Sequence, residues 1–152
     1  MMAAIAATII AVYLIIKAIR RMKQPVNPVT GKVTSPFGKR NAPVNGASTV
    51  HNGVDISVPE GTIVRSPWDG HVSDTYTDNA GGLQMIVVHN NGYRTGYAHL
   101  SGFIAEEGDI VKAGDAICRT GNTGNTTGPH LHFTLTDEHG AKINPETVFN
   151  FA

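Results

Sequence analysis

The sequence predicts an all-β fold, a compact and mostly antiparallel sheet with long loops, preceded by one N-terminal transmembrane helix. Beyond residue 30, short runs rich in Val, Ile, Thr and aromatic residues alternate with Gly, Asn, Asp and Pro, which is the pattern of short strands and turns. No stretch in that region repeats apolar residues with a 3.6-residue period over the length of a helix. The first 16 residues, by contrast, are uncharged and overwhelmingly apolar.

The apolar N-terminal run predicts an uncleaved membrane anchor over residues 1–23. Counted through Ile19, it reaches the lower end of the roughly 17 to 25 residues that span a bilayer. A cleavable signal peptide would place basic residues before the apolar run and a small-residue cleavage site after it. Here the basic cluster KAIRRMK follows the run, so a signal peptide and a buried helix are the less favoured alternatives. We therefore expect a lipid bilayer to be one partner of the chain.

Residues 24–31 are the predicted linker, because the two prolines and the glycine of QPVNPVTG break a helix. The predicted β-domain covers residues 32–152. Its expected strands are KVTS, VDISV, TIVRS, HVSDTYT, LQMIVVH, YRTGYAHL, DIVKAG, AICRTG and HLHFTLT.

Charge and cysteine content exclude several classes of function. All 12 acidic residues lie from Asp55 onward, and the chain from residue 28 carries 8 basic and 12 acidic side chains. This acidic balance argues against nucleic acid as a partner, because nucleic-acid binding requires a basic face. The single cysteine, Cys118, excludes an internal disulfide and a cysteine-based zinc site. Its apolar surroundings predict a buried, inert thiol.

The stretch TGNTGNTTGPHLHF places two histidines, His130 and His132, at the mouth of a predicted strand. If residues 131–136 form that strand, both imidazoles share one face, and Leu131 and Phe133 share the other. Two imidazoles on one face can serve one site. An H-x-H tripeptide by itself is also consistent with two surface histidines on a half-exposed strand.

The motif HNGVDI places His51 and Asp55 four residues apart, which on a strand is the same face. Gly53, Val54 and Ile56 favour extended structure over helix. Together with one imidazole of the H-x-H pair, these residues make two histidines and one carboxylate. That set is a normal catalytic zinc shell with its fourth position open to water. The spacing does not say which of the two imidazoles takes part.

A further histidine, His99 of GYAHL, ends the predicted strand YRTGYAHL. Three histidines with one aspartate exceed what the metal needs, so the spare imidazoles suit general acid–base work beside it. The remaining histidines, His71, His89 and His139, have no partner motif and are expected at surface or turn positions.

The motifs HNGVDI, GYAHLSGF, EEGDIVKAGD and GNTGNTTGPHLHF, in this order, closely resemble those of the lysostaphin-like zinc endopeptidases that cut peptidoglycan. The upstream VTSPFGKR and the late INPETVF fit the same family, so the resemblance covers about residues 32–150. It implies that residues 32–152 form a metallopeptidase domain with Zn²⁺ as its cofactor and a peptidoglycan peptide as its substrate.

The resemblance also assigns roles to individual residues. It implies that His51, Asp55 and His132 bind zinc, and that His99 and His130 are catalytic. Zinc then polarises the scissile carbonyl and lowers the pKa of a water molecule, while His99 or His130 takes the water proton. The division of work between these two histidines stays open.

In one respect the sequence departs from the family pattern. Some members carry a tyrosine a few residues before the first zinc histidine, which helps to hold the oxyanion. The segment NAPVNGASTVH has no tyrosine. Tyr93 or Tyr97 is the candidate substitute.

Two other functions compete with the peptidase. A non-catalytic relative that binds the cell wall or acts as a scaffold is disfavoured, because such relatives typically lose zinc ligands and all three are present here. The run GDIVKAGDAI also resembles the turn-rich halves of biotinyl and lipoyl carriers. Those carriers need a lysine at an exposed hairpin tip, and DNAGGLQMIVV offers none.

The biological setting follows from the predicted anchor. Peptidoglycan lies outside the cytoplasmic membrane, whereas the basic flank of the apolar run predicts a cytoplasmic domain. Two settings reconcile these observations: a membrane-anchored enzyme of the bacterial cell envelope, or a phage lysin carried in a virion membrane. The absence of a recognisable signal peptide favours the phage setting.

Overall fold

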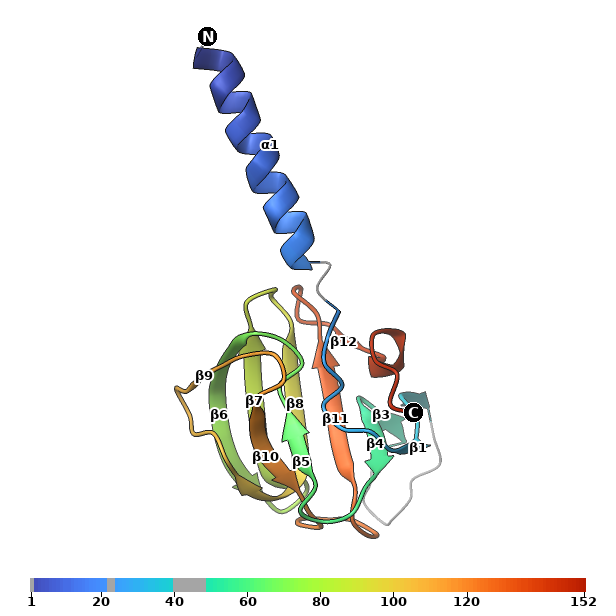
Figure 1. Cartoon of the computed structure of the whole chain (residues 1–152). Coiled ribbons are helices and arrows are strands. Elements are labelled where there is room, and N and C mark those ends of the chain that lie inside the picture. The colour runs from blue at the N-terminus through green and yellow to red at the C-terminus, as the bar shows by residue number, and fades with distance from the viewer. Residues whose placement is uncertain (1, 22–23, 40–48) are drawn as a thin grey trace.

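The structure is a computed structural model that describes residues 2–21, 24–39 and 49–152, with the side chains of the N-terminal helix described only over residues 6–16 (Figure 1). The elements are α1 (Met2–Arg21), β1 (Lys32–Ser35), β2 (Gly38–Lys39), β3 (Val50–His51), β4 (Val54–Ser57), β5 (Ile63–Arg65), β6 (Gly70–Asp78), β7 (Gly82–His89), β8 (Arg94–Phe103), β9 (Ile110–Val111), β10 (Ala116–Thr120), β11 (Leu131–Thr136), β12 (Lys142–Ile143) and the 3₁₀ helix η1 (Pro145–Thr147).

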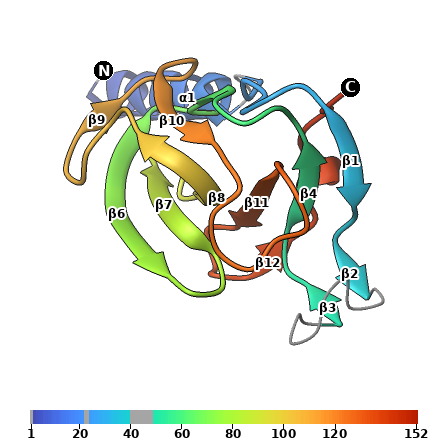
Figure 2. The same ribbon diagram turned by 90° about the horizontal axis from the view of Figure 1, so that it is seen from below.

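The described strands confirm the predicted antiparallel β fold. Ten of them join one sheet, whose main path runs β1–β4–β11–β8–β7–β6–β9, while β2 and β3 form a separate pair in the described part of the chain. Strand β10 pairs with β5 and β8, and β12 pairs with β11. The sheet curves from β6 through β8 and β11 to β4 and β1 (Figure 2). This order places β11, which carries the H-x-H motif, between β4 and β8.

The core lies on one face of this sheet, and strand β11 shows how alternation of side chains supplies it. In β11, Leu131, Phe133 and Leu135 are fully buried, whereas the side chains of His132 and Thr134 lie on the other face and are half-buried. The predicted strand 131–136 is therefore confirmed at both ends. Aromatic rings from the C-terminal segment close the core against Phe133. Cys118 is fully buried, as expected, and burial raises the pKa of its thiol.

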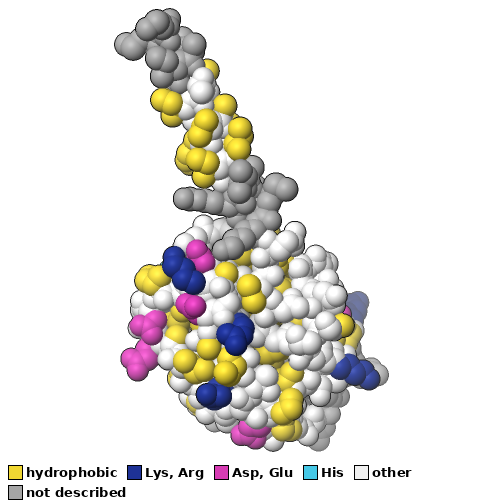
Figure 3. All heavy atoms as spheres, in the orientation of Figure 1, with side chains coloured by type: hydrophobic (Ala, Val, Ile, Leu, Met, Phe, Trp, Pro, Cys, Tyr) yellow, Lys and Arg dark blue, Asp and Glu magenta, His cyan; other side chains and the backbone are white. Residues whose placement is uncertain are grey.

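The N-terminal helix does not support the predicted transmembrane anchor over residues 1–23. Helix α1 extends away from the β-domain, and apolar side chains such as Ile9, Ile10 and Tyr13 are exposed along it (Figure 3). In the described part of the chain, however, no helix is long and apolar enough to cross a membrane.

Candidate metal centre

The first two residues of the candidate centre are placed by strand pairing. Strand β11 pairs with β4 in a register that sets His132 opposite Asp55, and cross-strand partners share a face. The neighbours of Asp55 in β4, Val54 and Ile56, are fully buried in the core. The alternation of both strands therefore turns the Asp55 carboxylate and the His132 imidazole to the opposite, open face.

His51 reaches the same point by a different route from the one the sequence predicts. Its strand β3 ends at His51, and a bend at residues 52–53 separates it from β4, so His51 and Asp55 do not lie on one continuous strand. The bend needs glycine, because a Cβ on Gly53 would lie 2.4 Å from the carbonyl oxygen of Phe133. The bend carries His51 inward, where it is only 2% exposed.

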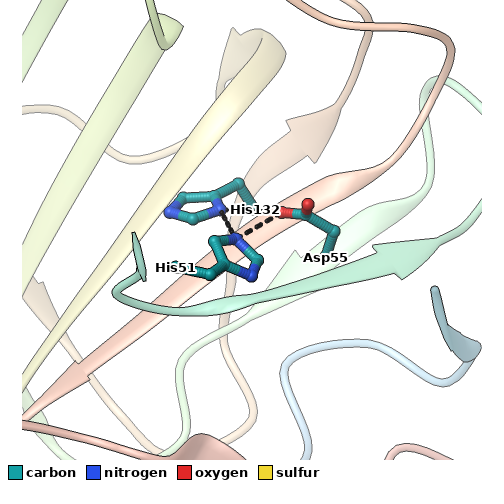
Figure 4. Close-up of side chains that lie close together, drawn as sticks. All are labelled: His51, Asp55 and His132. Carbon is teal, nitrogen blue, oxygen red and sulfur yellow. Dashed lines mark hydrogen bonds and ion pairs between the residues drawn. The ribbon is translucent and has the colours of Figure 1, made fainter. Parts of the chain in front are cut away.

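Three donor atoms of these residues converge (Figure 4). Asp55 Oδ1 lies 2.7 Å from His132 Nδ1 and 3.1 Å from His51 Nε2, and the two nitrogens are 3.1 Å apart. Donors bound tetrahedrally to zinc at about 2.0–2.1 Å are about 3.3 Å apart, so the group fits that ion. Among the described residues this group has three members, which matches the three protein ligands of catalytic zinc sites.

The surroundings of the group suit metal ligation. The Nδ1 hydrogen of His51 is directed to the carbonyl oxygen of Pro36 at 2.8 Å, so Nε2 keeps its lone pair for the centre. Burial opposes ionisation of Asp55, but the close contacts of its carboxylate with the imidazoles of His132 and His51 outweigh it and hold the pKa of Asp55 below its usual range. Burial lowers the pKa of His132, which favours the neutral imidazole that a metal requires.

His99 lies beside the centre on a distorted point of β8. Its φ of 60° is the only positive value of a non-glycine residue in the described part of the chain, and such backbone strain concentrates at functional sites. The distortion falls between two pairings of β8. Up to Ala98 the strand pairs with β11, and from Leu100 onward it pairs with β10. His99 Nδ1 donates to the carbonyl oxygen of Thr123 at 2.7 Å, which leaves Nε2 as the acceptor nitrogen. Burial lowers the pKa of His99.

His130 completes the set and has the same hydrogen-bonding pattern. Its Nδ1 donates to the carbonyl oxygen of Gly128 at 2.8 Å, and its Nε2 lies 3.8 Å from Asp55 Oδ1. The ring centroids of His130 and His99 are 4.6 Å apart. All five histidine and aspartate side chains expected from the sequence are thus brought together, although they come from four separate segments of the chain.

Sequence reasoning missed the role of the Gly/Thr loop, residues 121–129. This loop supplies the carbonyl oxygens that accept from both His99 and His130. Thr123 anchors it, since its hydroxyl donates to Leu100 O and accepts from Leu83 N. A Cβ on Gly82 would lie 2.2 Å from the Thr123 hydroxyl oxygen. Gly82 and Gly124, which approach each other at this contact, were the sequence signal for the position of the loop, because close backbone approach requires glycine.

Three expectations about other aromatic residues need correction. Tyr97 does not substitute for the missing tyrosine: it is 2% exposed, and its hydroxyl bonds to Thr95 within the core. Tyr93 stacks on Trp68 instead. His89 is not a surface residue, since it is 3% exposed and packs edge-on against Trp68.

Similarity to known proteins identifies the family of the chain. The model of peptidase family M23 matches residues 49–145, which include all five side chains of the site. The chain belongs to peptidase family M23. The predicted resemblance to lysostaphin-like metallopeptidases is confirmed by this match and by solved relatives.

Three similar proteins illustrate the relationship. The peptidoglycan DD-endopeptidase ShyB of Vibrio cholerae is 39% identical over 114 residues, which are 74% of this chain and 27% of ShyB. A zinc-containing peptidase from Vibrio cholerae superposes with a TM-score of 0.70 at 36% identity, over 80% of this chain and 37% of that one. The catalytic domain of lysostaphin from Staphylococcus simulans superposes with a TM-score of 0.69 at 33% identity, over 77% and 90%. This chain spans about a quarter of the length of the curated relatives it matches.

Proposed function

We propose that this chain is a zinc-dependent endopeptidase that hydrolyses peptide bonds in bacterial peptidoglycan cross-links. The observation that carries the proposal is the convergence of a three-donor metal group with two further imidazoles whose Nδ1 hydrogens are both held by loop carbonyls. Membership of family M23, a zinc-containing relative and a peptidoglycan DD-endopeptidase relative support the same reaction and cofactor.

In this proposal His51 Nε2, Asp55 Oδ1 and His132 Nδ1 hold the metal. The donor set of two imidazoles and one carboxylate suits zinc, and the near-equal separations of the three atoms suit one ion. A bound zinc ion supplies Lewis acidity toward a peptide carbonyl and toward water. Pro36 acts as the outer partner that fixes the orientation of the His51 ring.

His99 and His130 move protons in the proposed reaction. Because each donates through Nδ1 to a backbone carbonyl, each offers Nε2 as a base toward the centre. One imidazole takes a proton from the attacking water, and the resulting imidazolium can return that proton to the leaving amine. The charge of this imidazolium also stabilises the oxyanion. Neither Tyr93 nor Tyr97 is placed to take this role. The short separation of the two rings lets either residue serve.

The cell envelope is the proposed place of action, because the proposed substrate is cell-wall peptide. The finer setting, a lysin associated with a phage virion, stays a prediction that rests on the sequence alone. Detection of the chain in purified virions tests that setting. A gene located among bacterial cell-division genes would contradict it.

The decisive experiment measures new free amino groups after incubation of the full, zinc-loaded chain with purified peptidoglycan. We expect amine release from the wild-type chain and none from His132→Ala. Metal analysis of both proteins should show about one zinc per wild-type chain and much less in the variant. A folded, zinc-loaded wild-type chain that releases no amines from several wall types would point to the wall-binding alternative instead.

A further inference from the structure

A groove on the open face of the sheet leads away from the candidate metal centre. It holds ≈620 Å³, within the range of about 300–1,000 Å³ that is typical of ligand pockets. Its lining includes His132, Ala98, Gly96, Thr134, Arg94 and Lys142. The groove therefore connects the proposed zinc ligand with two cationic side chains.

Strand register places these residues in three successive rows. His132 pairs with Ala98, Thr134 with Gly96, and Thr136 with Arg94. Thr136 also pairs with Lys142 on its other side. Since residues two apart on a strand share a face, and paired residues share it too, Arg94 and Lys142 flank the groove on the same face as His132.

The middle row, Gly96 and Thr134, carries only small residues, and the Thr134 hydroxyl lies over Gly96. Gly96 has no side chain, and a Cβ at that position would lie 2.6 Å from the Thr134 hydroxyl oxygen. Ala98, which pairs with His132, has only a methyl group as its side chain. The floor between the metal ligand and the cations is thus lined by small side chains, so the cations are reachable from the centre along the groove.

Neither cation is neutralised by the protein. Arg94 and Lys142 are exposed, and within the described part of the chain neither forms a salt bridge. The Lys142 ammonium donates to the Thr134 hydroxyl at 3.3 Å, which holds it over the groove. The acidic residue of the lining, Asp74, lies across the sheet on β6 and accepts from Ser73 at 2.7 Å. Two positive charges at one end of the groove favour an anionic ligand group.

The distance from the centre fits a wall peptide. From His132 to Thr136 the strand advances four residues, which is about 13 Å at 3.3 Å per residue. An extended peptide covers this distance in about four residues. We propose that Arg94 and Lys142 form a subsite that binds a free carboxylate of the peptidoglycan stem peptide, about three to four residues from the bond that is cut. The inference rests on the proposed function and adds a determinant of specificity to it.

The test measures binding, separately from cleavage. The probes are a four-residue peptidoglycan stem peptide with free carboxylates, which contains no cross-link to cut, and the same peptide with these carboxylates amidated. Calorimetry gives their Kd values for the full, zinc-loaded chain, for Arg94→Gln, for Lys142→Gln and for Lys112→Gln as a control. Lys112 is an exposed lysine outside the groove that pairs with Asp69.

We expect the wild-type chain and Lys112→Gln to bind the free-carboxylate peptide about tenfold more tightly than the amidated one, the effect of one charge-assisted hydrogen bond. Arg94→Gln and Lys142→Gln should each lose most of this preference, and Arg94→Glu should reverse it. A preference retained in the variants, or a wild-type chain that binds both peptides equally or neither, overturns the subsite. Because amine release from peptidoglycan is measured separately, such a result leaves the proposed hydrolysis standing, and a failed hydrolysis leaves the binding result readable.

Discussion

Two regions of this molecule bury imidazoles, and only one of them is built like a reaction centre. At the candidate metal centre, His51 and His132 direct ring nitrogens toward each other and toward Asp55. In the second region, His89 lies against Trp68, and its Nε2 bonds to the Thr95 hydroxyl. In both regions burial lowers the pKa of an imidazole.

The difference between the two regions lies in what the nitrogens face. The Thr95 hydroxyl that contacts His89 Nε2 is itself bonded to Tyr97, and among the described residues the buried Nδ1 of His89 has no hydrogen-bond partner. The nitrogens of His89 thus meet one hydroxyl and apolar core, and no second titratable group in the described part of the chain. At the candidate metal centre, one ligand atom from each of His51, Asp55 and His132 lies close to the other two. A groove lined by His132 opens beside them. Burial and a shifted pKa are therefore not enough to mark a functional histidine. Convergence of several donors on a reachable space is the distinguishing feature.

The largest expected effect separates the two regions by metal content. His51→Ala should lose zinc and all measurable amine release, because it removes one of three proposed ligands. His89→Leu should keep about one zinc per chain, since it removes a polar group of the core and no ligand. Metal analysis of the purified proteins checks both. Zinc retained in His51→Ala would contradict the ligand assignment.

The second effect separates the proposed metal ligands from the two proposed acid–base histidines beside them. His99→Ala and His130→Ala should each lower kcat by about 10²–10⁴-fold while zinc stays bound, because they remove general acid–base catalysis and no ligand. The measurement is amine release beside metal content. A metal-free His130→Ala chain would show that His130 is a ligand.

The third effect concerns His89 and the pH dependence of stability. Burial lowers its pKa from 6.5 to about 4, so the unfolded chain takes up this proton first as the pH falls. The contribution of His89 to the free energy of unfolding is constant above pH 6.5 and decreases between pH 6.5 and 4, by about 3 kcal/mol in total. Chemical denaturation across this range checks the loss.

The matched control for this loss is His139→Gln, because His139 is 82% exposed and lies outside the core. His89→Leu should flatten the profile in this window. NMR titration of the His89 ring in the wild-type chain measures its pKa directly. A value near 6.5 would remove the physical basis of the expected loss.

The smallest expected effect tests how the loop holds His130, a proposed catalytic residue. The Thr126 hydroxyl lies 3.2 Å from His130 Nδ1 and accepts from Gly128 N. Thr126→Val removes these contacts but leaves the Gly128 carbonyl in place, so we expect kcat to fall about fivefold, the effect of roughly 1 kcal/mol. KM and zinc content should stay the same. An unchanged kcat would mean that the Gly128 carbonyl alone orients His130.

Much of the fold and the identity of the site residues could be predicted from the sequence. The alternation of apolar and polar residues in LHFTLT determined strand β11 and the face on which His132 lies, because side chains on a strand alternate by local geometry. The residue types at His51, Asp55 and the three further histidines predicted the metal chemistry. The N-terminal run is the exception: its apolar composition predicted a membrane span, and in the described part of the chain no helix is long and apolar enough to cross a membrane.

Only the tertiary structure decided how these residues meet. The bend at Gly53 against Phe133, the positive φ of His99 and the loop carbonyls of Thr123 and Gly128 all depend on contacts between distant parts of the chain. Strand register likewise aligned Arg94 with Lys142 across β11. Local patterns in a sequence fix which face a residue occupies, whereas register and close backbone approach arise only when the strands pack against each other.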